Sequence, residues 1–284
     1  MSNNKEAVKE LTDRLECGLD ALFNSKQYTD YLNMEAKFHN YSVNNIILIA
    51  LQYPEASRVA GFGAWKKNFN RNVKKGEKAI QILAPVVHKK EIKNPESKTD
   101  SGEEETKEVK WITYRRVNVF DVSQTEGDPL PELGVNELKG NVKEYKRFLE
   151  ALQQESPVLV SYEDVDGGAK GYFSKAEKKI VVQKGMSEAQ TIKTLIHEIT
   201  HAKLHSEKNE KSSRTKEVEA ESVAYIVGQR YGIDTSDYSF GYIAGWSSGK
   251  DRKELKNSLN TIRATAAEII DALDARLLAE SKTA

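Results

Sequence analysis

Two histidines and a glutamate occupy one short segment of the chain, His197-Glu198-Ile199-Thr200-His201. On an α-helix, residues i and i+4 lie one above the other, so His197 and His201 can bind one metal ion from the same helix face. Glu198 lies about a quarter-turn away, where its carboxylate can act on a metal-bound water without binding the metal itself. The spacing therefore predicts a hydrolytic metal site, and the ligand types suit zinc while tolerating manganese or cobalt.

The residues around this segment have the pattern of a half-buried helix. Ile192, Leu195, Ile199 and Ala202 form an apolar stripe beside the two histidines. With 5 His in 284 residues, a shuffled chain would contain this motif with a probability on the order of one in a hundred. The pattern favours a metal site over a pair of histidines buried in a core.

A catalytic zinc needs a third protein ligand and leaves its fourth position to water. The next predicted helix carries Glu217 and Glu221 on one face at i, i+4, while Glu219 points away from both. The alternative is that Glu217 and Glu221 belong to a solvated acidic helix face and bind no metal. His205 follows His201 by one turn, but a turn rises about 5.4 Å, so three histidines in a row recede from a single ion. We therefore expect His205 beside the site or on the surface.

The overall composition is balanced. With 43 basic and 43 acidic residues the formal net charge is zero, so global charge selects no partner, although strong local patches remain compatible with it. The single cysteine, Cys17, excludes an internal disulfide and suits a reducing compartment. The N-terminus has no apolar signal core, and the longest apolar run, Ile46 to Leu51, is too short to cross a membrane. We expect a soluble cytoplasmic protein without a membrane partner.

A charged segment interrupts the N-terminal half. Residues 89–110 are nearly free of apolar side chains, and β-like runs flank them at residues 79–87 and 111–122. The pattern predicts a long hairpin with a disordered tip. Helical spacing precedes it, at residues 8–22, 28–38 and 43–53.

A second break, with Gly127, Pro129 and Pro131, occurs at residues 123–133, and the linker that we place there spans residues 126–135. The linker separates domains at residues 1–125 and 136–284. The second domain shows the patterns of two further helices, a strand and a hairpin, at residues 137–154, 250–278, 158–162 and 171–183. The predicted fold class is α+β.

Basic and aromatic residues gather between Arg58 and Lys90. Nine Lys/Arg stand there against one acid, Glu77, and three aromatic rings are interleaved with them. Cations that follow a phosphate backbone, beside rings on which bases stack, are what single-strand binding uses. The alternative is a solvated basic face with Trp65 packed in the core. The residues that we assign to a DNA-binding surface are Trp65, Lys66, Lys67, Arg71, Lys74, Lys75 and Lys78.

Four segments of this half resemble the N-terminal domain of ArdC-type antirestriction proteins, in the family's order. They are Tyr41–Ile49, Gly63–Lys66, Val73–Lys78 and Val117–Gly127. The resemblance implies a single-stranded-DNA-binding domain from a plasmid or conjugative element, followed by a zincin-like metallopeptidase domain. The segment HEITHAKLH, residues 197–205, is also similar to ImmA/IrrE-like metallopeptidases.

The resemblance extends to the ligand set. In gluzincin-like sites and in ImmA/IrrE-like relatives, the helix after the HExxH motif contributes a Glu ligand and, one turn on, a second carboxylate or amide. Carried onto this sequence, Glu217 becomes the metal ligand and Glu221 holds a histidine by a hydrogen bond, which fixes its tautomer. The opposite assignment, in which Glu221 binds the metal and Glu217 holds a histidine, stays open.

Together these observations predict a two-domain protein that binds single-stranded DNA and carries a zinc-dependent peptidase. Zn²⁺ held by His197, His201 and Glu217 would lower the pKa of a bound water, and Glu198 would accept its proton during attack on a peptide carbonyl. Two other functions stay open. One is a DNA-protecting binder with structural zinc, and the other is a regulatory protease that cleaves a repressor protein.

Overall fold

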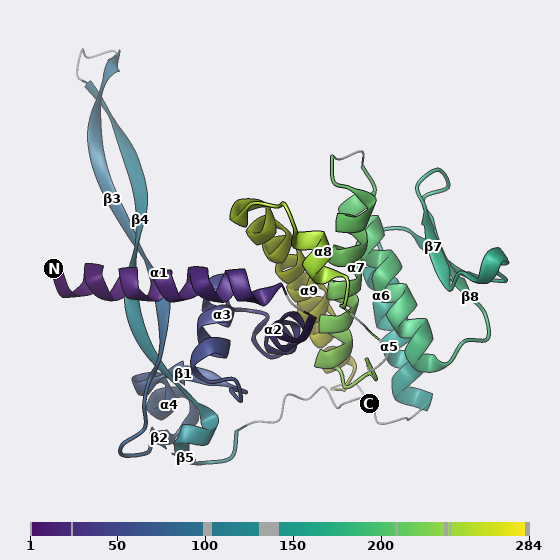
Figure 1. The fold of residues 1–284 in the computed structure, drawn as a ribbon, viewed down its shortest axis with the longest axis horizontal. Coiled ribbons are helices and arrows are strands. Elements are labelled where there is room, and N and C mark those ends of the chain that lie inside the picture. Colours follow the sequence, from purple (N-terminus) through teal and green to yellow (C-terminus); the bar gives the residue numbers. More distant parts are fainter. Residues whose placement is uncertain are drawn as a thin grey trace.

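The computed structural model describes residues 2–23, 25–98, 104–130, 142–207, 210–235, 238 and 240–281. Figure 1 shows a group of helices at the base of a long hairpin, and a second group of helices with a small sheet on its far side. This is a mixed α+β fold, as the sequence predicted. No described helix has both the length and the apolar content needed to cross a membrane.

Three helices open the chain: α1 (Ser2–Leu22), α2 (Ser25–Phe38) and α3 (Val43–Gln52). Their positions agree with the predicted helical spacing, and the leucines that repeat along α1 are buried. α3 begins after Ser42, whose hydroxyl accepts the Asn45 N–H at 3.4 Å. This hydrogen bond satisfies one of the free donors at the start of the helix.

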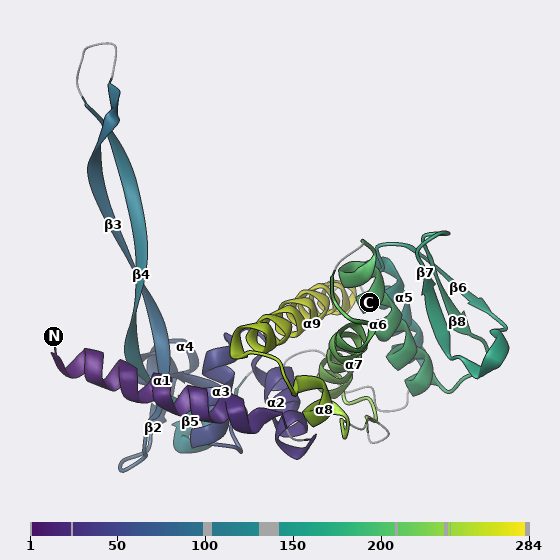
Figure 2. The same ribbon diagram turned by 45° about the horizontal axis from the view of Figure 1, so that its top comes forward.

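A two-stranded hairpin rises from these helices. It consists of β3 (Ile80–Lys98) and β4 (Glu104–Asp121), which pair antiparallel, and β1 (Val59–Gly61) joins the base of β4. Figures 1 and 2 both show the hairpin projecting away from the helices. The prediction of a disordered tip over residues 89–110 is wrong for most of that range, because the strands pair as far as Lys98 and Glu104. Residues 99–103 lie outside the described residues.

Charged composition did not prevent this pairing, for a physical reason. Over residues 84–90 and 108–116 no side chain on either face of the hairpin is buried, so Lys and Glu are tolerated there. Glu108 also forms ion pairs across and along the strands, at 3.5 Å with Lys89 and 3.0 Å with Lys110. Opposite charges on neighbouring strands stabilise the ladder rather than oppose it.

Short elements close the base of the hairpin: α4 (Phe62–Phe69), β2 (Arg71–Val73), a 3₁₀ turn (Val122–Gln124) and β5 (Thr125–Gly127). β2 pairs antiparallel with β5. The Arg71 guanidinium donates to the Thr125 hydroxyl at 2.7 Å, to the Thr125 carbonyl at 3.0 Å and to the Asp128 carbonyl at 2.5 Å. Position 127 requires glycine, because its φ is +137° and a Cβ there would lie only 2.5 Å from the Asn70 carbonyl oxygen.

Two residues predicted to contact DNA are therefore part of this framework. Trp65 is 1% exposed, and its indole N–H donates to the Phe120 carbonyl oxygen at 2.9 Å. An enclosed ring cannot stack on a base, so that prediction for Trp65 is wrong. Arg71 directs most of its donors to β5 and the residue after it, and its predicted role as a phosphate contact stays a prediction.

The C-terminal half contains five helices among its described residues: α5 (Val142–Glu155), α6 (Glu188–His205), α7 (Ser213–Arg230), α8 (Ile243–Ser247) and α9 (Arg252–Ser281). Beside α6 lie a 3₁₀ turn and a sheet with strand order β6-β8-β7: β6 (Leu159–Glu163), the turn (Asp166–Gly168), β7 (Gly171–Ser174) and β8 (Lys179–Gln183). β6 runs parallel to β8 and β7 antiparallel to it, which confirms the predicted hairpin.

The boundary between the two predicted domains is only partly described. Of the predicted linker at residues 126–135, residues 131–135 lie outside the described range, as does the predicted helix start at residues 137–141. The two halves nevertheless share one apolar core, in which α2 packs on α7 and α3 on α9. In that core Tyr28 Oη lies 2.9 Å from Ser222 Oγ, and the Tyr225 hydroxyl donates to Asn33 Oδ1 at 2.9 Å. The first half therefore contacts α7 directly.

Replacing Trp65 by Ala should lower the free energy of unfolding by about 3–5 kcal/mol, because it empties a large packed site. The Phe120 carbonyl also loses its hydrogen-bond donor. Urea unfolding followed by circular dichroism measures this change. The matched control is Trp65→Phe, which keeps most of the apolar volume and should cost about 1–3 kcal/mol through the unpaired carbonyl. An Ala variant as stable as the wild type would contradict this packing.

Candidate metal centre

The turn between α6 and α7 brings the predicted site together. α6 begins after Ser187, whose hydroxyl accepts the Gln190 N–H at 3.3 Å, and it carries the HExxH segment near its C-terminal end. α7 begins after Ser212, which caps it in the same way. Because the connection is short, the last turns of α6 lie against the first turns of α7, where Glu217 is located.

His197, His201 and Glu217 converge on one point. The Nε2 atoms of the two histidines are 3.0 Å apart. Glu217 Oε2 lies 3.4 Å from His197 Nε2, and its Oε1 lies 3.4 Å from His201 Nε2. Ligand atoms about 2.0–2.2 Å from a tetrahedral ion are about 3.3–3.6 Å from one another, so these three side chains have a spacing close to that of ligands of one ion.

The charges at this point are coupled. Hydrogen bonds from His197 and His201 hold the pKa of Glu217 well below its usual range. Burial acts to lower the pKa of His197, but the Glu217 hydrogen bond and the Glu198 charge outweigh it and raise the pKa above its usual value. Two imidazoles and one ionised carboxylate form a donor set that fits a divalent cation.

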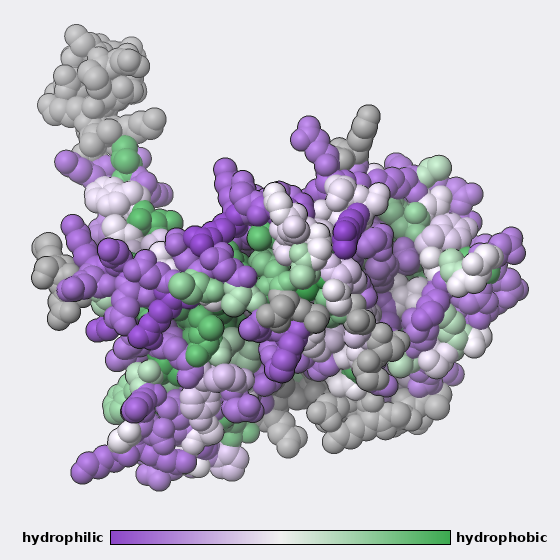
Figure 3. All heavy atoms as spheres, viewed as in Figure 1, coloured by the Kyte–Doolittle hydropathy of each residue, from purple (hydrophilic) through white to green (hydrophobic). Residues whose placement is uncertain are grey.

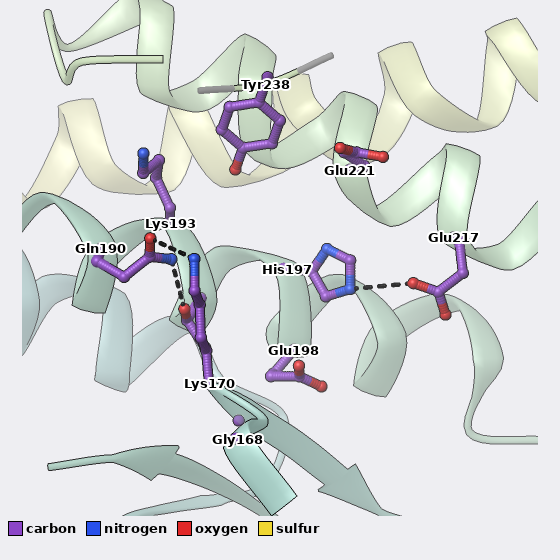
Figure 4. Close-up of a pocket in the computed structure, with 11 residues that line it drawn as sticks. Gly168, Lys170, Gln190, Lys193, His197, Glu198, Glu217, Glu221 and Tyr238 are labelled. Carbon is purple, nitrogen blue, oxygen red and sulfur yellow. Dashed lines mark hydrogen bonds and ion pairs between the residues drawn. The ribbon is translucent and has the colours of Figure 1, made fainter. Parts of the chain in front are cut away.

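Glu198 faces the same cavity. The cavity has a volume of about 530 Å³ and is lined by His197, Glu198, Glu217 and Glu221, among others. Figure 4 shows Glu198 beside His197, with Glu217 on the far side of the imidazole. Burial raises the pKa of the Glu198 carboxyl, and the nearby histidines lower it in part. A carboxyl whose pKa lies above the usual value is suited to accept and return a proton near neutral pH.

A glycine on β7 sets how closely the sheet approaches this cavity. A Cβ on Gly171 would lie 2.7 Å from Thr194 Cγ2 and 2.8 Å from the Val181 carbonyl oxygen. Any side chain there would therefore push β7 away from α6 and from Glu198. Sequence reasoning missed this role, since a lone glycine at the start of a strand carries no specific signal.

His205 lies behind the ligand pair, where the sequence placed it. Its Nδ1 is 3.0 Å from His201 Nδ1, and its Nε2 is 3.1 Å from Glu219 Oε2. Lys211 Nζ donates to both oxygens of Glu219, each at 2.8 Å. His205 and Glu219 are both buried. This hydrogen-bonded chain fixes the ring of His201, and Glu219 is a residue of the site that the sequence analysis missed because it lies off the face of Glu217.

Glu221 has a different role from the one expected. Its Oε2 accepts the Tyr242 hydroxyl, and it forms no hydrogen bond to a histidine within the described part of the chain. The prediction that Glu221 holds a histidine is therefore wrong, and Glu219 makes that contact. Burial raises the pKa of Glu221, and the Tyr242 hydrogen bond lowers it in part.

The remaining basic residues form an exposed surface at the base of the hairpin, which we call the five-lysine surface. Its members are exposed, and they are Lys66, Lys67, Lys74, Lys75 and Lys78. Gly76 makes the tight turn after Lys74 and Lys75, at φ +91°. The most open aromatic ring beside these lysines is Phe62, which is 65% exposed, while Phe69 is 36% exposed and Trp65 is buried.

Two protein families match successive parts of the chain. Residues 4–120 match the "N-terminal domain of anti-restriction factor ArdC", and residues 124–227 match the "Putative metallopeptidase family (DUF6782)". The second match contains the HExxH segment and Glu217. An uncharacterized protein of Bacillus anthracis is 30% identical over an alignment of 311 positions, which covers 96% of this chain and 52% of that protein. The chain thus spans about half the length of this relative.

One solved structure agrees at the level of the fold, and a second structure of the same protein is also similar. The metal-free crystal structure of the antirestriction ArdC protein from the R388 plasmid has a TM-score of 0.50 and 21% identity, over 83% of this chain and 85% of that one. The Mn(II)-bound structure of the same protein has a TM-score of 0.46 and 18% identity, over 84% and 85%. The chain therefore carries, in succession, a match to the ArdC N-terminal domain over residues 4–120 and a match to a metallopeptidase family over residues 124–227.

Proposed function

We propose that this protein is a metal-dependent peptidase joined to a single-stranded-DNA-binding domain, with an antirestriction role like that named for the R388 protein. The observation that best supports peptidase activity is that His197, His201 and Glu217 lie together at one cavity, which Glu198 also lines. A purely structural metal site does not need such a cavity or a fourth residue whose carboxylate does not bind the metal.

His197, His201 and Glu217 are the residues that would hold the cation, and we propose Zn²⁺ on the basis of ligand type. A cation in such a site makes water a better acid and polarises a substrate carbonyl. The Glu217 side chain is exposed and lines the cavity. The cation would therefore be accessible to a substrate that enters from this side.

Glu198 is proposed to move the proton. It accepts one proton from the attacking water as the oxygen–carbon bond forms, and it gives that proton to the leaving amine nitrogen as the carbon–nitrogen bond breaks. Its position next to His197 in the cavity and the raised pKa of its carboxyl support this assignment.

Replacing Glu198 by Gln should keep the bound metal and slow hydrolysis by about 100-fold or more, because the proton acceptor is removed while the ligands remain. Elemental analysis gives the metal content, and cleavage of a fluorescence-quenched peptide library gives the rate. The control is His197→Ala, which should lose both the bound metal and the hydrolysis. Full hydrolysis by the Gln variant would refute the mechanism. If that variant protected DNA as well as the wild type does, the DNA-protecting binder would be the better interpretation.

Replacing Glu219 by Gln should weaken metal binding by about 10- to 100-fold, because His205 and then His201 lose the charge that orients their rings. Competition with a chelator of known affinity measures the change. The matched control is Glu207→Gln, an exposed carboxylate just past the end of α6. Metal affinity that stays unchanged in the Glu219 variant, with its circular dichroism also unchanged, would contradict this role.

Single-stranded DNA is the proposed ligand of the N-terminal domain, and the five-lysine surface supports this. Its cations come from α4 and from the turn before β3, so they lie on adjoining elements at the base of the hairpin. Phe62 offers an exposed ring beside them. Trp65 and Arg71 hold these elements in place from beneath, through their bonds to Phe120 and Thr125.

Charge reversal of Lys74 and Lys75 to Glu should weaken binding of a labelled oligothymidylate by at least about tenfold at low salt. The slope of log affinity against log salt should fall by about 0.7 for each phosphate that the protein no longer neutralises. Fluorescence anisotropy measures both quantities. Reversal of Lys175 and Lys253, exposed in the C-terminal half, changes the net charge equally and serves as the control. Equal weakening in the two double variants would contradict a localised surface.

A further inference from the structure

The two faces of the hairpin differ in chemistry. Side chains alternate along a strand, so Trp111, Thr113 and Arg115 of β4 point to one side. Residues paired across the ladder point to the same side, which adds His88 opposite Trp111 and Lys90 opposite Val109. We call this side the Trp111 face.

Two aromatic rings are stacked on the Trp111 face. The ring centroids of His88 and Trp111 are 5.2 Å apart and the ring planes differ by 14°. His88 Nε2 also lies 2.7 Å from Thr113 Oγ1, so the imidazole is held from a second direction. Trp111 is 45% exposed, which leaves part of its ring open to solvent. An aromatic ring already held in place loses little freedom when a flat ligand stacks on it.

The charges of the Trp111 face are available to an anion. Lys90 and Arg115 are exposed, and no ion pair between described side chains involves either of them. On the opposite side of the hairpin the lysines pair with Glu108, and the exposed residues include aliphatic ones such as Ile112. Figure 3 shows apolar residues interrupting the hydrophilic surface of the hairpin. The Trp111 face thus combines an aromatic stack with net positive charge.

We propose that the Trp111 face binds single-stranded nucleic acid, with a base stacked on Trp111 and phosphates near Arg115 and Lys90. Every base has a π-face, so stacking of this kind accepts any sequence, while the cations meet the backbone. Bases within a duplex are already stacked on both sides and cannot use such a ring. This inference rests on the proposed DNA-binding function and adds a contact on the hairpin, apart from the five-lysine surface.

The position of the hairpin supports this ligand. In Figures 1 and 2 the outer part of the hairpin projects beyond the helices, while α1 crosses its lower part and contacts both strands. Lys90, Trp111, Thr113 and Arg115 are all exposed, so a flexible strand can reach this face. Thr113 and Arg115 follow Trp111 at intervals of about 6.7 Å along the strand, which places a hydroxyl and a guanidinium in line with the ring.

Replacing Trp111 by Ala should weaken binding of a labelled oligothymidylate by about 5- to 100-fold, the range found for removal of one base–aromatic stack. Trp111→Phe keeps a ring and should bind within a few-fold of wild type. The matched control is Ile112→Ala, which removes an equally exposed side chain from the other face of the same strand. Arg115→Ala should lower the salt slope by about 0.7. Anisotropy titrations at several salt concentrations measure all four variants.

The outcomes separate this inference from the proposed function. If Trp111→Ala and Ile112→Ala bind alike, while reversal of Lys74 and Lys75 still abolishes binding, the inference is overturned and the DNA-binding function stands. If the wild type does not bind at all, both are overturned. An equal weakening of duplex binding would refute base stacking. If Trp111→Ala changes the sedimentation coefficient instead of DNA affinity, the Trp111 face is a contact between copies of this chain.

Discussion

The close approach of α6 and α7 at their shared turn is the constraint on which the rest of the site depends. Only there do two imidazoles from one helix and a carboxylate from the next come within 3.4 Å of each other among the described residues. Three polar groups at such distances need a reason to stay together, because the fold brings charges close that water would otherwise solvate separately. A divalent cation would supply that reason, and the chain from the partly exposed Lys211 through the buried Glu219 and His205 fixes His201 from behind.

α7 also joins the two halves of the protein. The side that faces α6 carries Glu217, while Tyr28 and Asn33 of α2 bond to Ser222 and Tyr225 further along the same helix. The ArdC N-terminal domain and the metallopeptidase-family domain therefore share a core. α2 of the first half therefore packs directly on the helix that carries the third ligand candidate.

Zero net charge hides an uneven distribution of charge. Carboxylates gather at the cavity, where Glu198, Glu217 and Glu221 lie within reach of one another's charge. Lysines gather at the base of the hairpin, far along the chain from that cavity. Local arrangement and not total charge therefore decides what each half attracts, which in our proposals is a metal cation in one and a polyanion in the other.

The sequence by itself determined the features that depend on neighbours along the chain. The pairing of His197 with His201, the helices around them and the hairpins follow from spacing within a few residues, which is local physics. The crossing of α7 with α6, which local spacing cannot give, brings Glu217 rather than Glu221 to the two histidines, although both share one face of α7. It also turned Trp65 inward and brought Glu219 to His205. Which side of a short helix faces the core, and which of several carboxylates meets a given histidine, is set by packing between elements that are distant in the chain.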